Sequence, residues 1–199
     1  MIISIPPTQT AGSDNLVYWD NFLTDADIDK ILSLSTWHEA RPGEVGRDNK
    51  ATVDLSVRSS QISWMTRNTE TEAIWTKIVT LIAEVNRTYF HYDLTGCYEP
   101  AQLAIYKATD EGHYNWHCDN AVTDAKVPRK LSMSLMLSDP VEFDGGELQI
   151  KTNSDVARSL EQRKGRIWFF PSYTLHRVSP VTRGVRRSLV LWVGGPGFK

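Results

Sequence analysis

The chain has 199 residues, of which 41% are hydrophobic and 23% charged, and its formal net charge is −2. This length suits one domain with a sizeable core, and this composition excludes a disordered, collagen-like or coiled-coil chain. A net charge so close to zero creates no global field that would attract nucleic acid or an anionic membrane surface, so we expect neither as a partner.

The pattern of apolar and polar residues in the first half of the chain predicts two helices and two short strands. A strand is expected over 17–19, and a helix begins at Thr24, has acidic residues in its first turn and ends near Ser35. The polar, glycine-containing stretch 38–51 predicts a long loop, either a mobile lid or a connector. Alternating apolar residues over 53–57 predict a half-buried strand, and a 3.6-residue apolar period predicts a second helix over about 70–89.

From residue 100 onward the pattern changes to short strands separated by glycine-containing turns. The strands are expected over 101–107, 131–137, 147–151, 166–170, 175–179 and 187–193. Helices followed by many strands predict an α+β, mainly β fold, in which the helices pack on one face of an antiparallel sandwich. Eight strands in two sheets would form a jelly roll, or double-stranded β-helix. We expect a single domain over 1–199, with 1–99 as support and 100–199 as the core.

The two cysteines, Cys97 and Cys118, form neither a disulfide framework nor a paired zinc-knuckle spacing. We expect Cys118 to be a buried free thiol. The apolar run at the N-terminus lacks a basic leader and is too short for a signal peptide or a membrane span. With so few cysteines, the expected location is the reducing cytoplasm.

A histidine and a carboxylate two residues apart, His117 and Asp119, are joined far downstream by His176. Two imidazoles and one carboxylate are the side chains of a facial triad, which leaves open positions on iron for oxygen chemistry. Residues i and i+2 of a strand share one face, so His117 and Asp119 could reach one ion, with His176 arriving from a strand that faces them. A second match to the pattern, 91–93, lies in no strand pattern. Zinc would also accept this ligand set.

Further motifs accompany the triad, in one order along the chain: Tyr106, Gly112, Tyr114, 117–119, 129–132, 144–148, 170–172, His176, 178–184, Arg186 and Trp192. In this order they resemble the prolyl and lysyl hydroxylase group of the iron and 2-oxoglutarate oxygenases, of the prolyl 4-hydroxylase type. The resemblance is close over about 90 residues and looser before them. One departure is that some relatives carry a second tyrosine on the strand occupied here by Met133, Leu135 and Met136.

The resemblance implies a metal site, a cosubstrate site and a substrate pocket. Fe(II) would be held by His117, Asp119 and His176, with 2-oxoglutarate and dioxygen at the open positions and ascorbate as a candidate reductant. Arg186 would pair its planar guanidinium with the far carboxylate of 2-oxoglutarate. Tyr106 and Ser188 are further candidates for binding the cosubstrate, and the candidates for the substrate pocket are Tyr114, Trp116 and Trp192.

These features together predict a dioxygenase that hydroxylates an unactivated C–H bond. By analogy with the family, its target would be a prolyl or other residue of a protein or peptide. A free amino acid, another small molecule or a nucleobase is the alternative substrate. A non-catalytic jelly-roll binding module is the alternative of another class, and a zinc hydrolase is a third; neither has a use for an arginine placed for a dicarboxylate.

Overall fold

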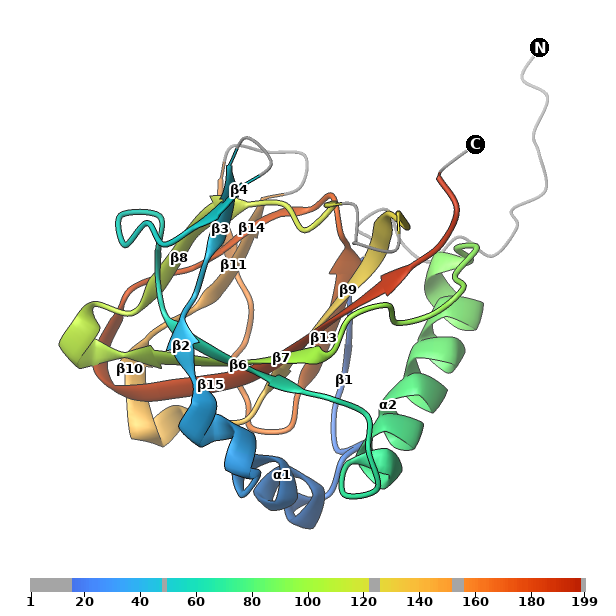
Figure 1. Cartoon of the computed structure of the whole chain (residues 1–199), viewed down its shortest axis with the longest axis horizontal. Helices are drawn as coiled ribbons and strands as arrows, with labels where there is room; N and C mark the ends of the chain where they lie inside the picture. Colours follow the sequence, from blue (N-terminus) through green and yellow to red (C-terminus); the bar gives the residue numbers. More distant parts are fainter. Residues whose placement is uncertain (1–15, 48–49, 122–125, 152–155, 198–199) are drawn as a thin grey trace.

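The computed structural model describes residues 16–47, 50–121, 126–151 and 156–197 (Figure 1). Two α-helices cover one side of an antiparallel β-structure made of two sheets, so the predicted helix-covered jelly roll is confirmed. The larger sheet runs in the order β1 (Val17–Trp19), β13 (Ile167–Pro171), β9 (Arg129–Met136), β15 (Val181–Gly194), β7 (Ala101–Lys107), β6 (Gln61–Met65) and β2 (Arg41–Pro42), with β10 (Phe143–Gly145) paired to β15.

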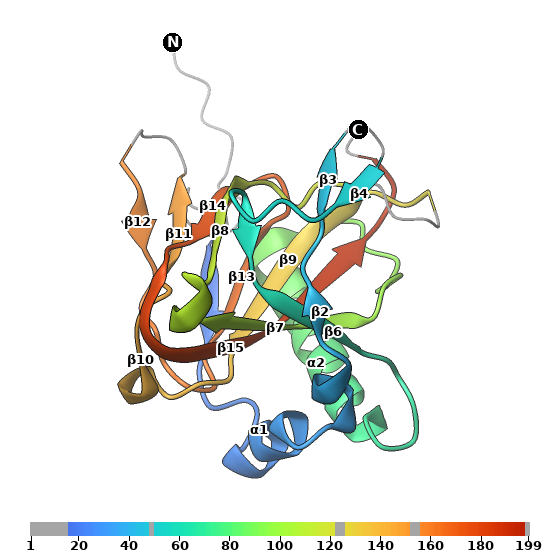
Figure 2. The same ribbon diagram turned by 60° about the vertical axis from the view of Figure 1, so that its left-hand side comes forward.

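The smaller sheet supplies the other half of the jelly roll. It runs in the order β12 (Arg158–Ser159), β11 (Leu148–Lys151), β14 (Leu175–Val178), β8 (His113–His117) and β5 (Arg58–Ser59). A separate hairpin, β3 (Val45–Arg47) and β4 (Lys50–Thr52), stands at the open end of the two sheets, where Figure 2 shows it above β2 and β6. The short 3-10 helix η1 (Ser35–Glu39) leads into β2.

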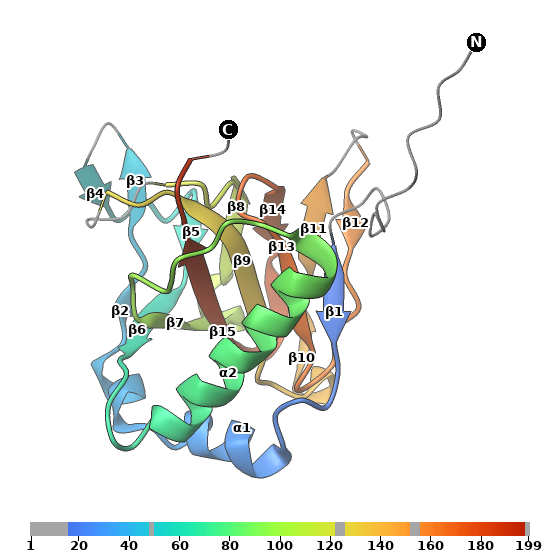
Figure 3. The same cartoon turned by 90° about the vertical axis from the view of Figure 1, so that its right-hand side faces the viewer.

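The helices α1 (Asp25–Leu32) and α2 (Glu72–Val85) pack on the outer face of the larger sheet (Figure 3). A capping box starts α1, because Thr24 accepts from the backbone of Asp27 while the Asp27 carboxylate accepts from the backbone of Thr24. The apolar stripe of α2 is buried in the main core: Ile74, Ile78, Leu81, Ile82 and Val85. Among the described residues, no helix combines the length and apolar character that crossing a membrane would need.

Alternation along β9 explains why the larger sheet has an apolar outer face and a more polar inner one. Leu131, Met133 and Leu135 belong to the core beneath the helices and are fully buried. The residues between them point the other way, toward the smaller sheet. Two of these are serines, Ser132 and Ser134, and both are buried. The space between the sheets is therefore lined partly by hydroxyl groups.

Two expectations for individual segments were wrong. The segment 38–51 is not a plain loop, because it contains part of η1 and the strands β2 and β3 and the start of β4. Residues 53–57 form turns rather than a half-buried strand, and Val53 and Leu55 are 51% and 63% exposed. Asp54 accounts for this, since its side chain accepts from the backbone N–H of Ser56 at 3.0 Å and so favours a turn.

The last strand is longer than expected. β15 starts at Val181 rather than near residue 187, and Gly184 lies within it at a φ of 70°. This glycine pairs with Phe143 of β10, and a side chain there would collide with the carbonyl of Glu142. The glycine-containing stretch 182–184, which fits the turns expected between strands, is therefore a kink inside one continuous strand.

Candidate active site

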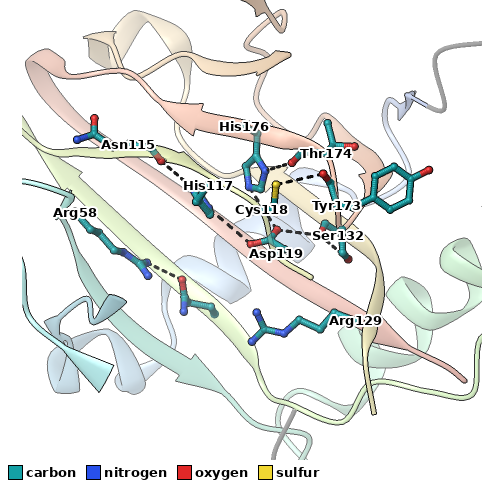
Figure 4. A network of polar contacts seen from close by, with 12 residues as sticks. Arg58, Asn115, His117, Cys118, Asp119, Arg129, Ser132, Tyr173, Thr174 and His176 are labelled. Carbon is teal, nitrogen blue, oxygen red and sulfur yellow. Dashed lines mark hydrogen bonds and ion pairs between the residues drawn. The ribbon is translucent and has the colours of Figure 1, made fainter. Parts of the chain in front are cut away.

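The two histidines of the predicted triad lie on neighbouring strands of one sheet. His117 is the last residue of β8 and pairs in register with His176 of β14. We had expected strands that face each other; instead the strands are hydrogen-bonded neighbours, and the ring centroids are 4.2 Å apart. Asp119 follows the end of β8, where its backbone N–H donates to the carbonyl of Ser172 at 2.7 Å. Figure 4 shows the three side chains pointing toward one another.

The potential ligand atoms of these three residues converge. Nε2 of His117 is 3.7 Å from one Asp119 carboxylate oxygen, and Nε2 of His176 is 3.4 Å from the other. One ligand atom from each residue can be chosen so that all lie within 4.8 Å of one another, and in the described part of the chain no other histidine, cysteine or acidic group forms such a cluster. The second His-x-Asp match is not part of it, and His91 instead ends the π-helical turn 86–90 in a left-handed conformation.

Backbone carbonyls orient both imidazoles. Nδ1 of His117 lies 2.7 Å from the carbonyl of Asn115, and Nδ1 of His176 lies 2.8 Å from that of Thr174. A carbonyl can only accept, so each Nδ1 must carry the proton and donate it. This tautomer leaves the lone pair on each Nε2, which is the nitrogen that faces Asp119, available to a metal.

The electrostatics favour a neutral imidazole beside an ionised carboxylate. Burial, with a contribution from neighbouring His176, lowers the pKa of His117 to about 4, so this ring is neutral near pH 7. Burial alone would raise the pKa of Asp119, but the two histidines and a hydrogen bond from Ser132 lower it below its usual range. Metal ligation requires these same protonation states.

Two serines hold the Asp119 carboxylate from behind. Ser132 of β9 donates to Asp119 Oδ2 at 2.9 Å, and the Ser132 and Ser172 hydroxyls are 3.0 Å apart. With its own proton donated to Asp119, Ser132 accepts from Ser172. All three side chains are buried, so this chain of hydrogen bonds is shielded from water and fixes the carboxylate orientation.

A bulge in β8 decides which aromatic residues face the triad. Val178 pairs with Tyr114, and His176 pairs with His117. Between these two pairs the chain advances by three residues in β8 but by only two in β14, so β8 contains one extra residue. Tyr114 and His117 therefore face the same side, and their rings stack with centroids 3.6 Å apart. Trp116 is turned away from this side.

Trp116, one of the three candidates for the pocket, consequently lies outside the cavity. Its ring instead contacts the cations of Lys151 and Arg177, at 5.1 and 4.8 Å from the ring centroid. The other two candidates, Tyr114 and Trp192, do line the cavity that contains the triad. Cys118, which we expected to be buried, is exposed, and its thiol donates to the carbonyl of Tyr173 at 3.2 Å.

A cavity of about 500 Å³ lies between the two sheets and joins the triad to Arg186. Arg186 projects from β15 of the larger sheet and is 2% exposed. Its Nη1 donates to Ser188 at 3.0 Å, and its guanidinium lies 5.3 Å from the ring centroid of Tyr106 on β7. Its buried Nε has no hydrogen-bond partner among the described residues. The cavity thus contains a buried cation with unused donors opposite three potential metal ligands.

Two further arginines line the cavity: Arg58, which the sequence did not single out, and Arg129, which stands in the motif 129–132 but was given no role. Arg58 is 4% exposed, donates to Gln102 at 2.7 Å and lies 4.6 Å from the ring centroid of Tyr114. Arg129 forms a two-pronged ion pair with Glu99 and lies 3.8 Å from the ring centroid of Trp192. Arg58 occupies a two-residue strand with no periodicity around it, and a lone arginine carries no sequence signal of burial.

Comparisons with known proteins agree with this geometry. Residues 101–194 match the model of the 2OG-Fe(II) oxygenase superfamily. A PKHD-type hydroxylase of Teredinibacter turnerae is 40% identical over 88 residues, which cover 41% of this chain and 38% of that protein. The PKHD-type hydroxylase PiuC of Pseudomonas aeruginosa is 37% identical over 89 residues, or 42% of this chain and 39% of that protein. The alignments thus span about two fifths of the relatives' length.

Solved structures extend the likeness to nearly the whole chain. A prolyl-4-hydroxylase of Pseudomonas putida superposes with a TM-score of 0.70 at 20% identity, covering 93% of this chain and 95% of that one. A Trichoplax adhaerens prolyl hydroxylase, solved with a peptide fragment of hypoxia inducible factor, gives 0.73 at 18% identity, covering 92% and 84%. At these identities the likeness shows the fold. Residues 101–194 are therefore similar to the 2OG-Fe(II) oxygenase superfamily, and the chain has the fold of the prolyl hydroxylases.

Proposed function

We propose that this protein is an Fe(II)- and 2-oxoglutarate-dependent dioxygenase that hydroxylates an unactivated C–H bond, with a prolyl residue of a protein or peptide as its target. One observation carries the proposal: His117, Asp119 and His176 line a single cavity together with Arg186, which comes from the opposite sheet. A metal site alone would not need a buried arginine, and an anion site alone would not need the triad.

The ligand set fits ferrous iron. Two neutral imidazoles and one carboxylate, converging from one end of a sheet, supply three ligands and leave the cavity side of the ion open. When bound there, Fe(II) and 2-oxoglutarate supply the activation of dioxygen and the oxidation of the C–H bond. The protein residues supply the geometry: the carbonyls behind each Nδ1 and the hydroxyl of Ser132 keep the three ligands aimed at one point.

The opposite wall fits the distal carboxylate of 2-oxoglutarate. The planar fork of Arg186 can donate two parallel hydrogen bonds to a carboxylate, and its buried Nε is unpartnered in the described structure. Ser188 and Tyr106 lie beside it and are the proposed additional donors. No tyrosine is contributed from β9, where Met136 packs in the same cluster as Tyr106. Arg186, Tyr106 and Ser188 would therefore carry most of the recognition.

A peptide substrate is supported by the relatives and by the cavity. Curated relatives are PKHD-type hydroxylases, and one similar structure is a prolyl hydroxylase solved with a peptide fragment. The cavity measures about 500 Å³ and must also hold the cosubstrate, so the greater part of a longer substrate would lie outside it. A free amino acid or other small molecule is the second candidate, and the segment that contains β2 and β3 would then close over it.

We further propose that the described residues act as a single domain in a reducing compartment such as the cytoplasm. Both sheets contribute to the one cavity, so neither half of the chain would form the site alone. Cys97 and Cys118 are both unpaired. An exposed thiol such as Cys118 persists more readily where thiols are kept reduced.

The test is succinate release from 2-oxoglutarate by the purified protein with added Fe(II) and ascorbate. His176→Ala should abolish it, because two remaining ligands cannot hold the ion at this geometry. His91→Ala is the matched control, since His91 belongs to the second His-x-Asp match and lies outside the cluster. Equal succinate release by wild type and His176→Ala would refute the proposal. Comparing a proline-containing peptide with free proline and with nucleotides identifies the substrate class.

A further inference from the structure

A second depression of the surface adjoins the catalytic cavity. It measures about 850 Å³ and is lined by residues of η1, β2 and β6. The depression shares three lining residues with the catalytic cavity, Glu44, Ile62 and Trp64, so the two hollows adjoin there. We call this depression the η1–β2 groove. In Figure 2, β2 runs beside β6 from the helical end of the molecule up toward the β3–β4 hairpin.

We infer that the η1–β2 groove binds the part of an extended peptide substrate that flanks the hydroxylated residue, and that it prefers basic side chains there. This inference rests on the proposed peptide hydroxylase function. The first support is extent: the cavity measures about 500 Å³ and must also hold the cosubstrate, whereas an extended chain adds a further residue every ~3.3 Å. Flanking residues must therefore leave through the mouth, and the groove is a hollow path that starts there.

The second support is an exposed aromatic residue at the junction. Trp64 lies on β6, is 39% exposed and lines both hollows. An indole face held at the surface by a strand offers a stacking platform for a proline ring or for the side chain of lysine or arginine. Ile62 is next to it on the same face of β6 and adds an apolar floor.

The third support is charge. The acidic residues of the groove, Glu39 and Glu44, outnumber its one permanently charged base, Arg41. All three are exposed, and none forms an ion pair with another described residue. By contrast, the catalytic cavity contains Arg58 and Arg186. A peptide with a neutral reactive residue and a basic flank would match both regions.

The experiment measures the KM of peptides with one central proline in an alanine and glycine background. Lysine or glutamate is placed on the N-terminal flank in one series and on the C-terminal flank in another. In the series whose flank enters the groove, lysine peptides should have the lower KM. Glu39→Lys should reduce or invert this preference by roughly two- to fivefold, the size expected for exposed charge pairs. The preference should fade at high ionic strength.

Two controls separate this inference from the proposed function. Glu142→Lys makes the same change in charge at an exposed glutamate that lines neither hollow, and should leave the preference intact. Succinate released in the absence of peptide should be equal in wild type and Glu39→Lys, because Glu39 does not line the catalytic cavity. A protein that consumes 2-oxoglutarate but discriminates none of the peptides by charge would overturn the groove assignment. Absence of 2-oxoglutarate turnover under every condition would overturn the function itself.

Discussion

Replacing Ser132 by alanine should weaken metal binding without removing a ligand. The Ser132 hydroxyl is fully buried and donates to Asp119 Oδ2 at 2.9 Å. A hydrogen bond to a charged group contributes about 1.5–3 kcal/mol, and loss of such an outer partner typically costs about 10–100-fold in metal affinity. The two ranges agree, since about 1.4 kcal/mol corresponds to a factor of ten. We therefore expect the dissociation constant for Fe(II) to rise by about 10–100-fold.

Anaerobic calorimetric titration of the metal-free protein with Fe(II) measures this dissociation constant directly. Ser63→Ala is the matched control, because the Ser63 hydroxyl is also buried but has no hydrogen-bond partner in the described structure. It should leave Fe(II) affinity unchanged. If Ser132→Ala bound Fe(II) as tightly as wild type, the carboxylate would not depend on this hydroxyl for its orientation, and the reasoning would fail.

Three further predictions concern the cosubstrate, the core and an ion pair. Arg186→Lys should raise the 2-oxoglutarate KM by at least about tenfold, because a point charge replaces a two-pronged donor; an unchanged KM would contradict the role of Arg186. Ile78→Ala should lower the free energy of unfolding by about 2–5 kcal/mol in urea titrations, and Val79→Ala, exposed on the same helix, by far less. Hydrogen bonding to Arg166 lowers the pKa of Asp20, so this carboxylate stabilises the fold above its unfolded-state pKa of about 3.9 and loses that effect as pH falls. The difference in melting temperature between wild type and Asp20→Asn should therefore shrink below about pH 4, and a constant difference would argue against the pair.

The sequence predicted the elements in which a regular apolar pattern continues over many residues, and it predicted the fold that these elements build. The 3.6-residue period that includes Ile74 and Val85 identified α2, and alternation over 131–137 identified β9. The short edge elements could not be predicted in this way. Residues 53–57 alternate in polarity, but the hydrogen bonds around Asp54 form turns there, because local side chain to backbone bonding outweighs a pattern of only three apolar residues.

The spacing and order of the motifs predicted that the triad and Arg186 belong to one site. They did not predict which strands carry these residues side by side or which way the side chains face. Nothing in the sequence marks the bulge in β8, so strict alternation placed Trp116 on the same side as Tyr114. The burial of Arg58 depends on Gln102 and the ring of Tyr114, and these contacts join residues more than forty positions apart. Contacts of this kind follow from the assembled sheets and from no local pattern.

The extra residue in β8 also makes the spacing of this strand a functional property in itself. Residues three apart in a regular strand face opposite sides, so a β8 of the same length without the bulge would turn either Tyr114 or His117 to the outer surface, although every ligand would still be encoded. A protein with all three ligands but a regular strand here would thus lack either the imidazole or the stacked tyrosine ring inside its cavity. A list of ligand side chains would not detect this difference, whereas the register of β8 against β14 does.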